Sequence, residues 1–334
     1  MTRHGGIIFV TVCVLLILMG GALVVAEGLL FKIDFKPLDN YQLASSFPAD
    51  EIAPQPQDGF SSEDYSSMQF GTGTVLRDPN IQNILLIGSD TRGGEEYGNS
   101  DTMMLLSINN KTKQVKMVSF LRDLYVKING MRDNRINASY AYGGPRLLIN
   151  TIENNFKIKI DNYICADFQS FETIIDSVGG VQMSLTKAEA KELNTHPETY
   201  FVDGKVQEVS AGINHLNGAG ALGYVRIRHI DSDFGRTERQ RKVLGAVMSS
   251  LKHSSPITLV GLANSVIPLV KTDLTNSQVL SLISQTSSLL GNQTVQTAIP
   301  ADGDYEPNTI RGMDVLVPDI EKNKAVIWKL LYNR

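Results

Sequence analysis

The sequence predicts an α/β domain that follows one membrane-spanning helix, and three observations support this prediction. Strand-like and helix-like segments alternate beyond residue 80 without a second linker. An uncharged apolar run precedes them, followed by a stretch rich in Pro, Ser, Asp and Gln. The 334 residues are 42% hydrophobic and 20% charged, which provides for a packed globular core. We therefore expect a leader (1–6), an anchor (7–26), a linker (27–80) and one α/β domain (81–334) with a motif core over 83–252 and a C-terminal α/β extension over 253–334.

The apolar run of residues 7–26 is long enough to cross a membrane as a helix. At about 1.5 Å per residue it spans roughly 30 Å, which is the thickness of a bilayer core. A secretory signal usually has an apolar stretch of only about 7 to 15 residues, so we favour an uncleaved anchor over a signal cleaved after Ala26. Both alternatives export the rest of the chain. Arg3 and the amino terminus favour a cytoplasmic N-terminus and an extracellular C-terminal domain.

The net charge and the cysteine and histidine content exclude several functional classes. A formal charge of −4 argues against a protein that binds nucleic acid through counterion release. Cys13 lies in the apolar run and Cys165 in a separate apolar segment, so we expect no disulfide. The five histidines lack metal-ligand spacing and are interpreted as ordinary surface or core residues. No Ser-His-Asp or Cys-His arrangement suggests covalent catalysis.

Three strands are predicted at the start of the domain. Residues 83–88 (NILLIG) form a continuous apolar run, typical of a strand that is buried on both faces. Residues 102–108 (TMMLLSI) and 115–121 (VKMVSFL) are the second and third strands, and they flank a turn at 109–112. The second and third strands are therefore expected to form an antiparallel hairpin.

Charged residues are expected to gather at one end of these strands. If Ile108 lies opposite Val115, antiparallel pairing places Asp101 opposite Arg122. Asp90 leaves the first strand on the other side of the same loop. Two carboxylates and an arginine then converge at a sheet edge, where α/β folds commonly bind ligands. The alternative is a structural ion pair together with a turn aspartate.

The middle of the chain continues the alternation of helix and strand. Gly144-Pro145 is typical of a helix start, and the pattern LLINTIENNF continues that helix. Residues 162–168 and 181–185 are strand-like, and residues 171–178 are helix-like. Residues 224–228 (YVRIR) alternate with a period of two, which predicts a strand with Arg226 and Arg228 on one face. A solvated strand face is the usual explanation of such a pair.

Residues 235–252 predict an amphipathic helix that starts after Asp231 and Asp233. At about 100° per residue, Arg236 and Gln240 fall on its apolar stripe. The flanks and the back of that stripe are expected to carry Arg239, Arg241 and Lys242.

A buried arginine needs an anionic partner, because an unpaired desolvated charge is costly. Arg226, Arg228 and Arg236 are therefore predicted to form one pocket, and the fork geometry of arginine suits phosphate. The segment 226–242 holds six Lys or Arg against three acids, in a chain that is acidic overall. Carboxylates such as those of Asp90 and Asp101 are typical ligands for Mg²⁺ that is bound to substrate phosphates.

Seven motifs in the chain share their order and spacing with one known family: GSDTR (88–92), NSDTMMLLSI (99–108), SFLRDLYV (119–126), RINASYAYGGP (135–145), VGGV (178–181), LNGAGALGYVRIRH (216–229) and DSDFGRTERQRKVL (231–244). Together they resemble a LytR-CpsA-Psr domain over about 170 residues. The resemblance implies a central mixed β-sheet flanked by helices on both faces and a long apolar pocket for a polyprenyl chain. It also implies transfer of an anionic glycopolymer, teichoic acid or capsule, from undecaprenyl pyrophosphate to peptidoglycan.

The resemblance assigns roles to individual residues. Asp90 and Asp101 match aspartates that bind Mg²⁺ or Mn²⁺. The matching phosphate-binding arginines are Arg122, Arg226, Arg228 and Arg236, with Asp233 and Gln240 beside them and Arg92 in the DTR element. Leu121 and Leu124 depart from the family, which usually has Pro and Ser or Thr at these positions.

The predicted mechanism is electrostatic, because phosphoryl transfer depends mainly on positioning and on charge neutralisation. Asp233 either accepts the proton of the attacking hydroxyl or caps the helix and orients Arg236. Alternatives are a binding protein or pyrophosphatase for polyprenyl pyrophosphate, and a membrane-bound transcriptional regulator. The last requires a cytoplasmic recognition helix, for which only about six residues precede the apolar run.

Overall fold

The computed structural model divides the chain into two compact units. We call Pro37–Thr112, Lys116–Tyr163 and Val295–Arg334 the sheet unit, and Met1–Lys36, Lys113–Val115 and Ile164–Thr294 the helical unit. No helix in the described part of the chain is long and apolar enough to cross a membrane. The predicted anchor, residues 7–26, lies outside that part. The structure describes residues 34–38, 68–90, 97–201, 205–231, 233–252, 265–279, 281–282 and 295–334.

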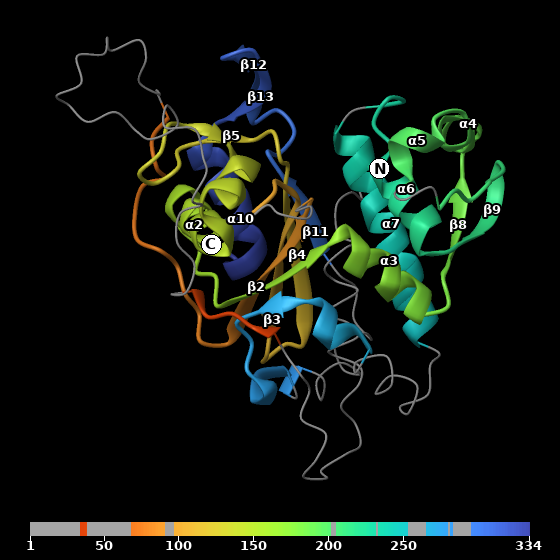
Figure 1. The fold of residues 1–334 in the computed structure, drawn as a ribbon. Coiled ribbons are helices and arrows are strands. Elements are labelled where there is room, and N and C mark those ends of the chain that lie inside the picture. The colour runs from red at the N-terminus through yellow and green to blue at the C-terminus, as the bar shows by residue number, and fades with distance from the viewer. Residues whose placement is uncertain are drawn as a thin grey trace. The chain divides into compact units, whose positions relative to one another are not determined.

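The sheet unit contains a mixed sheet whose strands follow the order β2-β3-β4-β11 (Figure 1). β2 and β3 pair antiparallel, whereas β11 runs parallel to β4. Eight of the nine residues of β2 are buried, as its apolar run predicts. The predicted mixed α/β class is thus confirmed. The strands are β2 (Ile81–Ser89), β3 (Ser100–Asn109), β4 (Gln114–Phe120) and β11 (Val295–Ile299).

Two helices of the sheet unit, α2 (Ile136–Phe156) and α10 (Ile320–Tyr332), pack against each other (Figure 1). The sequence predicted that the first helix starts at Gly144-Pro145. This start is wrong for α2 as a whole, because α2 begins at Ile136. Gly143 and Gly144 have non-helical dihedral angles, and Gly144 has a φ of 57°. Pro145 therefore opens the second half of a kinked helix.

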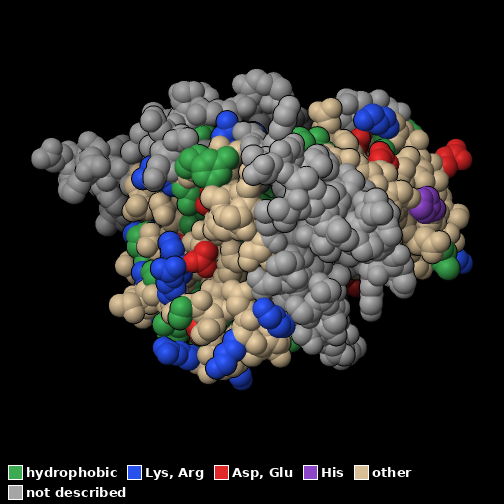
Figure 2. Space-filling view, turned by 90° about the horizontal axis from the view of Figure 1, so that it is seen from below, with side chains coloured by type: hydrophobic (Ala, Val, Ile, Leu, Met, Phe, Trp, Pro, Cys, Tyr) green, Lys and Arg blue, Asp and Glu red, His purple; other side chains and the backbone are tan. Residues whose placement is uncertain are grey.

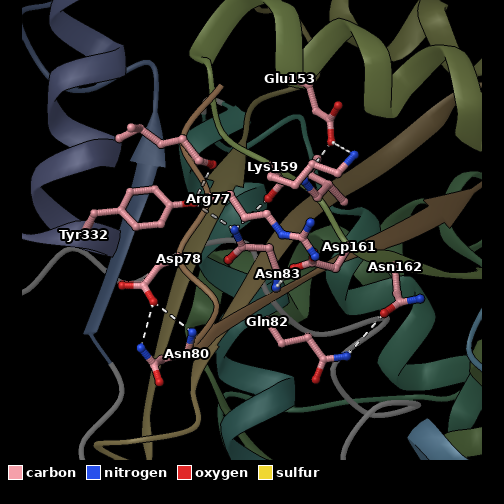
Figure 3. A network of polar contacts seen from close by, with 12 residues as sticks. Arg77, Asp78, Asn80, Gln82, Asn83, Glu153, Lys159, Asp161, Asn162 and Tyr332 are labelled. Carbon is pink, nitrogen blue, oxygen red and sulfur yellow. Dashed lines mark hydrogen bonds and ion pairs between the residues drawn. The ribbon is translucent and has the colours of Figure 1, made fainter. Parts of the chain in front are cut away.

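A polar network fixes the first residues of β2 (Figure 3). The Asn83 main-chain N–H donates to Asp161 Oδ2 at 2.9 Å, and its side-chain amide donates to the Lys159 carbonyl at 2.7 Å and to the Tyr332 hydroxyl at 3.1 Å. Lys159 Nζ in turn donates to Glu153 Oε1 at 2.9 Å. These bonds connect β2 to both helices of the unit.

Residues 68–80, which the sequence assigned to the linker, contact the folded part of the sheet unit. Met68 is buried in a small apolar cluster with Tyr125 and Val315. Leu76 forms a parallel bridge with Ile158. Two hairpins complete the unit: β5 (Tyr125–Val126) with β6 (Asn134–Arg135), and β12 (Tyr305–Ile310) with β13 (Met313–Pro318).

Asp133 makes the stability of the sheet unit depend on pH. Burial raises the pKa of Asp133 to about 6 from an ordinary 3.8, and its Oδ2 accepts the Met68 N–H at 3.1 Å. A carboxyl whose pKa is raised on folding stabilises the fold below about pH 4, and this contribution is lost as the pH rises to about 6. Asn can accept the same hydrogen bond without ionising. We expect the free energy of unfolding of Asp133→Asn to increase, relative to that of the natural protein, by of order 2 kcal/mol as the pH rises from 4 to 7. Urea unfolding at several pH values measures this, and parallel curves for the two proteins contradict it.

The described part of the helical unit consists of short strands and of helices. β1 (Asp34–Phe35) pairs parallel with β10 (Lys271–Thr272), which pairs antiparallel with β7 (Asn162–Asp167). The other elements are α3 (Phe168–Ser177), β8 (Val181–Leu185), α4 (Lys187–Thr195), α5 (Pro197–Tyr200), β9 (Gly212–Leu216), α6 (Gly218–Arg226), α7 (Asp233–Lys252) and a short 3₁₀ helix (Ile267–Leu269). The strands at 162–168 and 181–185 and the helix at 171–178 are confirmed within a few residues.

Residues 224–228 do not form the predicted strand, because Tyr224 to Arg226 are the last turn of α6. Asn217 caps this helix, and its side chain accepts the Gly220 N–H at 2.8 Å. A Cβ at Gly218 would lie 2.2 Å from the Glu172 carbonyl oxygen, so α6 packs closely on α3 only because residue 218 is glycine. Capping and close packing thus override the period-two pattern.

Candidate functional site

The sheet unit brings Asp101 and Arg122 together, as the strand register predicted. Arg122 Nη1 donates to Asp101 Oδ1 at 3.2 Å, and both side chains are largely buried. Asp123 Oδ2 lies 3.5 Å from Arg122 Nε, and its Oδ1 lies 3.1 Å from Arg135 Nη1. Arg122 is therefore held between two carboxylates and cannot swing freely.

Asp90 lies at the same end of the sheet as Asp101. Ser89 pairs with Ser100 across β2 and β3, and the Asp90 N–H donates to the Asn99 carbonyl at 3.0 Å. The register shifts between Gly88, which pairs with Thr102, and Ser89, so Asp101 is the extra residue of an irregularity in the ladder. Two acids and one arginine thus occupy one edge of the sheet unit.

This donor set fits a hard cation only together with substrate oxygens. Among the described residues, no group of three or more His, Cys, Asp or Glu could hold a metal ion. Asp90 and Asp101 supply two carboxylates, and Arg122 already engages one oxygen of Asp101. Mg²⁺ usually binds one or two carboxylates plus phosphate oxygens and water, so the set is compatible with a cation that arrives with a phosphate ligand.

Leu121 shows how the chain departs from the family pattern without losing Arg122. The Leu121 N–H donates to the Ile299 carbonyl at 2.8 Å, a bond that proline could not make. Leu121 and Leu124 are both fully buried. The two leucines therefore fix the segment that carries Arg122 against the core and against β11.

In the helical unit, Arg226 and Arg228 do not share a strand face. Arg226, the last residue of α6, is half-buried and donates from Nη1 to the Tyr200 carbonyl at 2.8 Å. Its guanidinium lies 5.3 Å from the centroid of the Phe168 ring. Arg228 follows the helix end and is exposed. The prediction of a shared face is wrong because α6 extends through residue 226.

α7 confirms the predicted helix and the inward direction of Arg236 and Gln240, which are 4% and 7% exposed. Lys242 is on the outside, with its ammonium 3.4 Å from Glu238. The prediction for Arg239 is wrong: it is 2% exposed, because Asp231 and the Ile227 carbonyl bind its guanidinium. A helical wheel contains only the residues of one helix, so it does not show partners that come from the preceding loop.

A cluster that the sequence analysis missed lies beside Arg226. The Tyr200 hydroxyl donates to Glu192 Oε1 at 2.7 Å, and His229 Nδ1 lies 3.0 Å from the same oxygen. The hydrogen bond from Tyr200 lowers the pKa of Glu192, and burial with the Glu192 contact raises the pKa of Tyr200 to about 12. The nearest sequence signal is the position of His229 directly after Arg228, while Tyr200 and Glu192 precede His229 by 29 and 37 residues.

Some predicted site residues are not described. Arg92 lies in residues 91–96, outside the described part of the chain, and so does the side chain of Asp233, whose main chain begins α7. The union of Asp90, Asp101 and Arg122 with the arginines of the helical unit in one pocket stays a prediction.

Comparison with known proteins adds to this geometry. The model of the LytR_cpsA_psr family matches residues 53–329. The chain belongs to this family. Two curated relatives of this LytR_cpsA_psr protein carry the name "Polyisoprenyl-teichoic acid--peptidoglycan teichoic acid transferase TagU". The one from Bacillus anthracis is 35% identical over 225 residues, which cover 66% of this chain and 69% of the relative. The one from Oceanobacillus iheyensis is 35% identical over 265 residues, covering 75% and 76%.

A solved structure described as TagT bound to LIIa-WTA has a similar fold. It superposes with a TM-score of 0.62 at 26% identity and covers 76% of this LytR_cpsA_psr chain and 91% of its own. The mixed α/β fold is therefore shared with a ligand-bound protein of known structure.

Proposed function

We propose that this chain transfers an anionic glycopolymer of the teichoic acid or capsule type from a polyprenyl pyrophosphate carrier to peptidoglycan. Membership of the LytR_cpsA_psr family, with two curated relatives named as teichoic acid transferases, carries the proposal. The arginines agree with it, because the planar fork of a guanidinium suits phosphate, and Arg236 lies on the inward side of α7.

The phosphate-binding residues act through charge and position. Arg122 is oriented by Asp101 and Asp123, and Arg226 by the Tyr200 carbonyl. Asp90 and Asp101 hold Mg²⁺ or Mn²⁺, which when bound neutralises charge on the pyrophosphate oxygens. The full set of proposed ligands of the pyrophosphate is Arg92, Arg122, Arg226, Arg228, Arg236 and Gln240.

In the proposed reaction, a muramoyl hydroxyl oxygen attacks the phosphorus that carries the polymer. A new oxygen–phosphorus bond forms, and the bond to the bridging oxygen breaks, so that polyprenyl phosphate leaves. Asp233 is the candidate that accepts the hydroxyl proton. The arginines stabilise the charge that develops on the phosphoryl oxygens, which is the main form of catalysis in phosphoryl transfer.

A reconstituted assay tests this function. Purified full-length chain is incubated with lipid-linked teichoic acid precursor and peptidoglycan, and polymer attached to peptidoglycan and polyprenyl phosphate released are both measured. Transfer produces the two in equal amounts. Release without attachment identifies a pyrophosphatase, and absence of both products identifies a binding protein.

Residues 7–26 are proposed to hold the enzyme in the cell membrane, with the N-terminus in the cytoplasm and the catalytic part outside. This location places the arginines close to a lipid-linked substrate. Protease treatment of intact wall-stripped cells checks it, since full protection of the chain contradicts the orientation.

A further inference from the structure

Arg239 is a buried charge whose two terminal nitrogens bind three neighbouring oxygens. Its Nη1 and Nη2 donate to the two carboxylate oxygens of Asp231, each at 2.7 Å, and Nη2 also donates to the Ile227 carbonyl at 2.6 Å. This bidentate fork is the strongest arrangement of an arginine with a carboxylate. A guanidinium that is 2% exposed needs such partners, because an unpaired buried charge is costly.

A second carboxylate, that of Glu189, lies close to this pair. Glu189 Oε1 lies 3.7 Å from Arg239 Nη1 and accepts the Tyr224 hydroxyl at 3.3 Å. Its Oε2 accepts the Thr186 N–H at 2.8 Å, as part of the capping box of α4. Burial raises the pKa of Tyr224, so its hydroxyl stays protonated and donates. Arg239 therefore connects α7 with α4 and with the end of α6.

Gly235 provides the room that the Asp231 carboxylate occupies. A Cβ at residue 235 would lie 2.2 Å from Asp231 Oδ2 and 2.3 Å from its Cγ. Any side chain at this position has to displace the carboxylate from the first turn of α7, and with it one partner of Arg239.

These contacts determine where three of the proposed phosphate ligands lie. Ile227 stands between Arg226 and Arg228, and its carbonyl is fixed by Arg239. Arg236 lies on the same helix as Arg239, three residues earlier. One guanidinium therefore fixes the backbone that carries Arg226 and Arg228 relative to the helix that carries Arg236.

We propose that Arg239 and Asp231, with Gly235, form a positioning pair that sets the spacing of the phosphate-binding arginines of the helical unit. The inference rests on the proposed function. In a site that works by orientation, a displacement of about 1 Å can cost on the order of 10²-fold in rate. A pair that serves only stability has no such effect on the folded enzyme.

Gly235→Ala and Asp231→Asn test the pair without removing the buried arginine, since Arg239→Ala can simply prevent folding. Gly245→Ala is the matched control, because it lies on the same helix and a Cβ there meets no atom within 4 Å. Ala is the better helix former at both positions. We expect Gly235→Ala to lose at least tenfold in kcat/KM for transfer and in affinity for octaprenyl pyrophosphate in detergent, and Gly245→Ala to match the natural chain.

The double variant adds a second test. Gly235→Ala and Asp231→Asn disrupt the same contact, so their combination is expected to lose little more than either alone. Arg239→Lys is expected to keep only part of the activity of the natural chain, because an ammonium cannot bind both Asp231 oxygens and the Ile227 carbonyl as the guanidinium does. Thermal unfolding of every variant gives the folded fraction to which the rates are normalised.

The outcomes separate the two hypotheses. If the natural chain transfers polymer and the folded Gly235→Ala and Asp231→Asn variants equal it in kcat/KM and affinity, the positioning role is overturned and the proposed function stands. If the natural chain neither binds octaprenyl pyrophosphate nor transfers polymer, the proposed function is overturned, and the inference with it.

Discussion

Replacing Arg236 by Ala is expected to reduce polymer transfer by about 10²-fold or more, the effect typical of removing one donor that stabilises transition-state charge. Arg236 is 4% exposed on the inward side of α7. If Arg236 binds the pyrophosphate as proposed, its loss removes a charged donor from the substrate, whereas loss of a solvated helix residue changes activity and stability little. Affinity for polyprenyl pyrophosphate and transfer rate are expected to fall together, and Arg236→Lys is expected to recover only part of both.

Lys242→Ala is the control for Arg236→Ala. Lys242 lies on the same helix, 44% of its side chain is exposed, and its partner Glu238 is exposed as well. Such a pair is worth at most about 1 kcal/mol, so the control is expected to keep its activity. Arg239 is unsuitable as a control because it is buried. Equal activities of the two variants after normalisation to folded protein contradict a phosphate-binding role for Arg236.

The charged pair of the sheet unit was predictable because strand pairing follows from residue numbers. Asp101 and Arg122 meet at 3.2 Å as the register of a hairpin requires. Arg236 and Gln240 were predictable for a similar reason, because the period of a helix fixes their side from local sequence alone. Both predictions depend on regular geometry within one element or one hairpin.

The errors have a common cause in contacts that the periodic pattern of a single element does not contain. The YVRIR alternation predicted a strand, yet Asn217 caps a helix before it and Gly218 lets that helix pack on the Glu172 carbonyl. Arg239 was assigned to the flank of α7, where Asp231 and Ile227 bury it. A pattern read along the chain does not contain the partner that satisfies a polar group in three dimensions.

The two aspartates at the sheet edge, Asp90 and Asp101, are both expected to be required for transfer. Asp90→Asn and Asp101→Asn are each expected to reduce transfer by about 10²-fold, because each removes a carboxylate ligand and an essential charge. A higher Mg²⁺ concentration is expected to restore part of the activity of both variants. Asp314→Asn, at an exposed carboxylate on β13, is the control.

Asp101 also binds Arg122. The activities of the two Asn variants at different Mg²⁺ concentrations therefore distinguish a metal-binding role from a role in the ion pair. A cation held by both carboxylates makes both Asn variants sensitive to Mg²⁺, and isothermal titration of Mg²⁺ in the presence of octaprenyl pyrophosphate is expected to show weaker binding to both. An ion pair that only orients Arg122 makes Asp101→Asn defective at every Mg²⁺ concentration and leaves Asp90→Asn active. Full activity of the natural chain in EDTA, with both Asn variants unimpaired, removes the cation from the mechanism and leaves the arginines as the source of charge stabilisation.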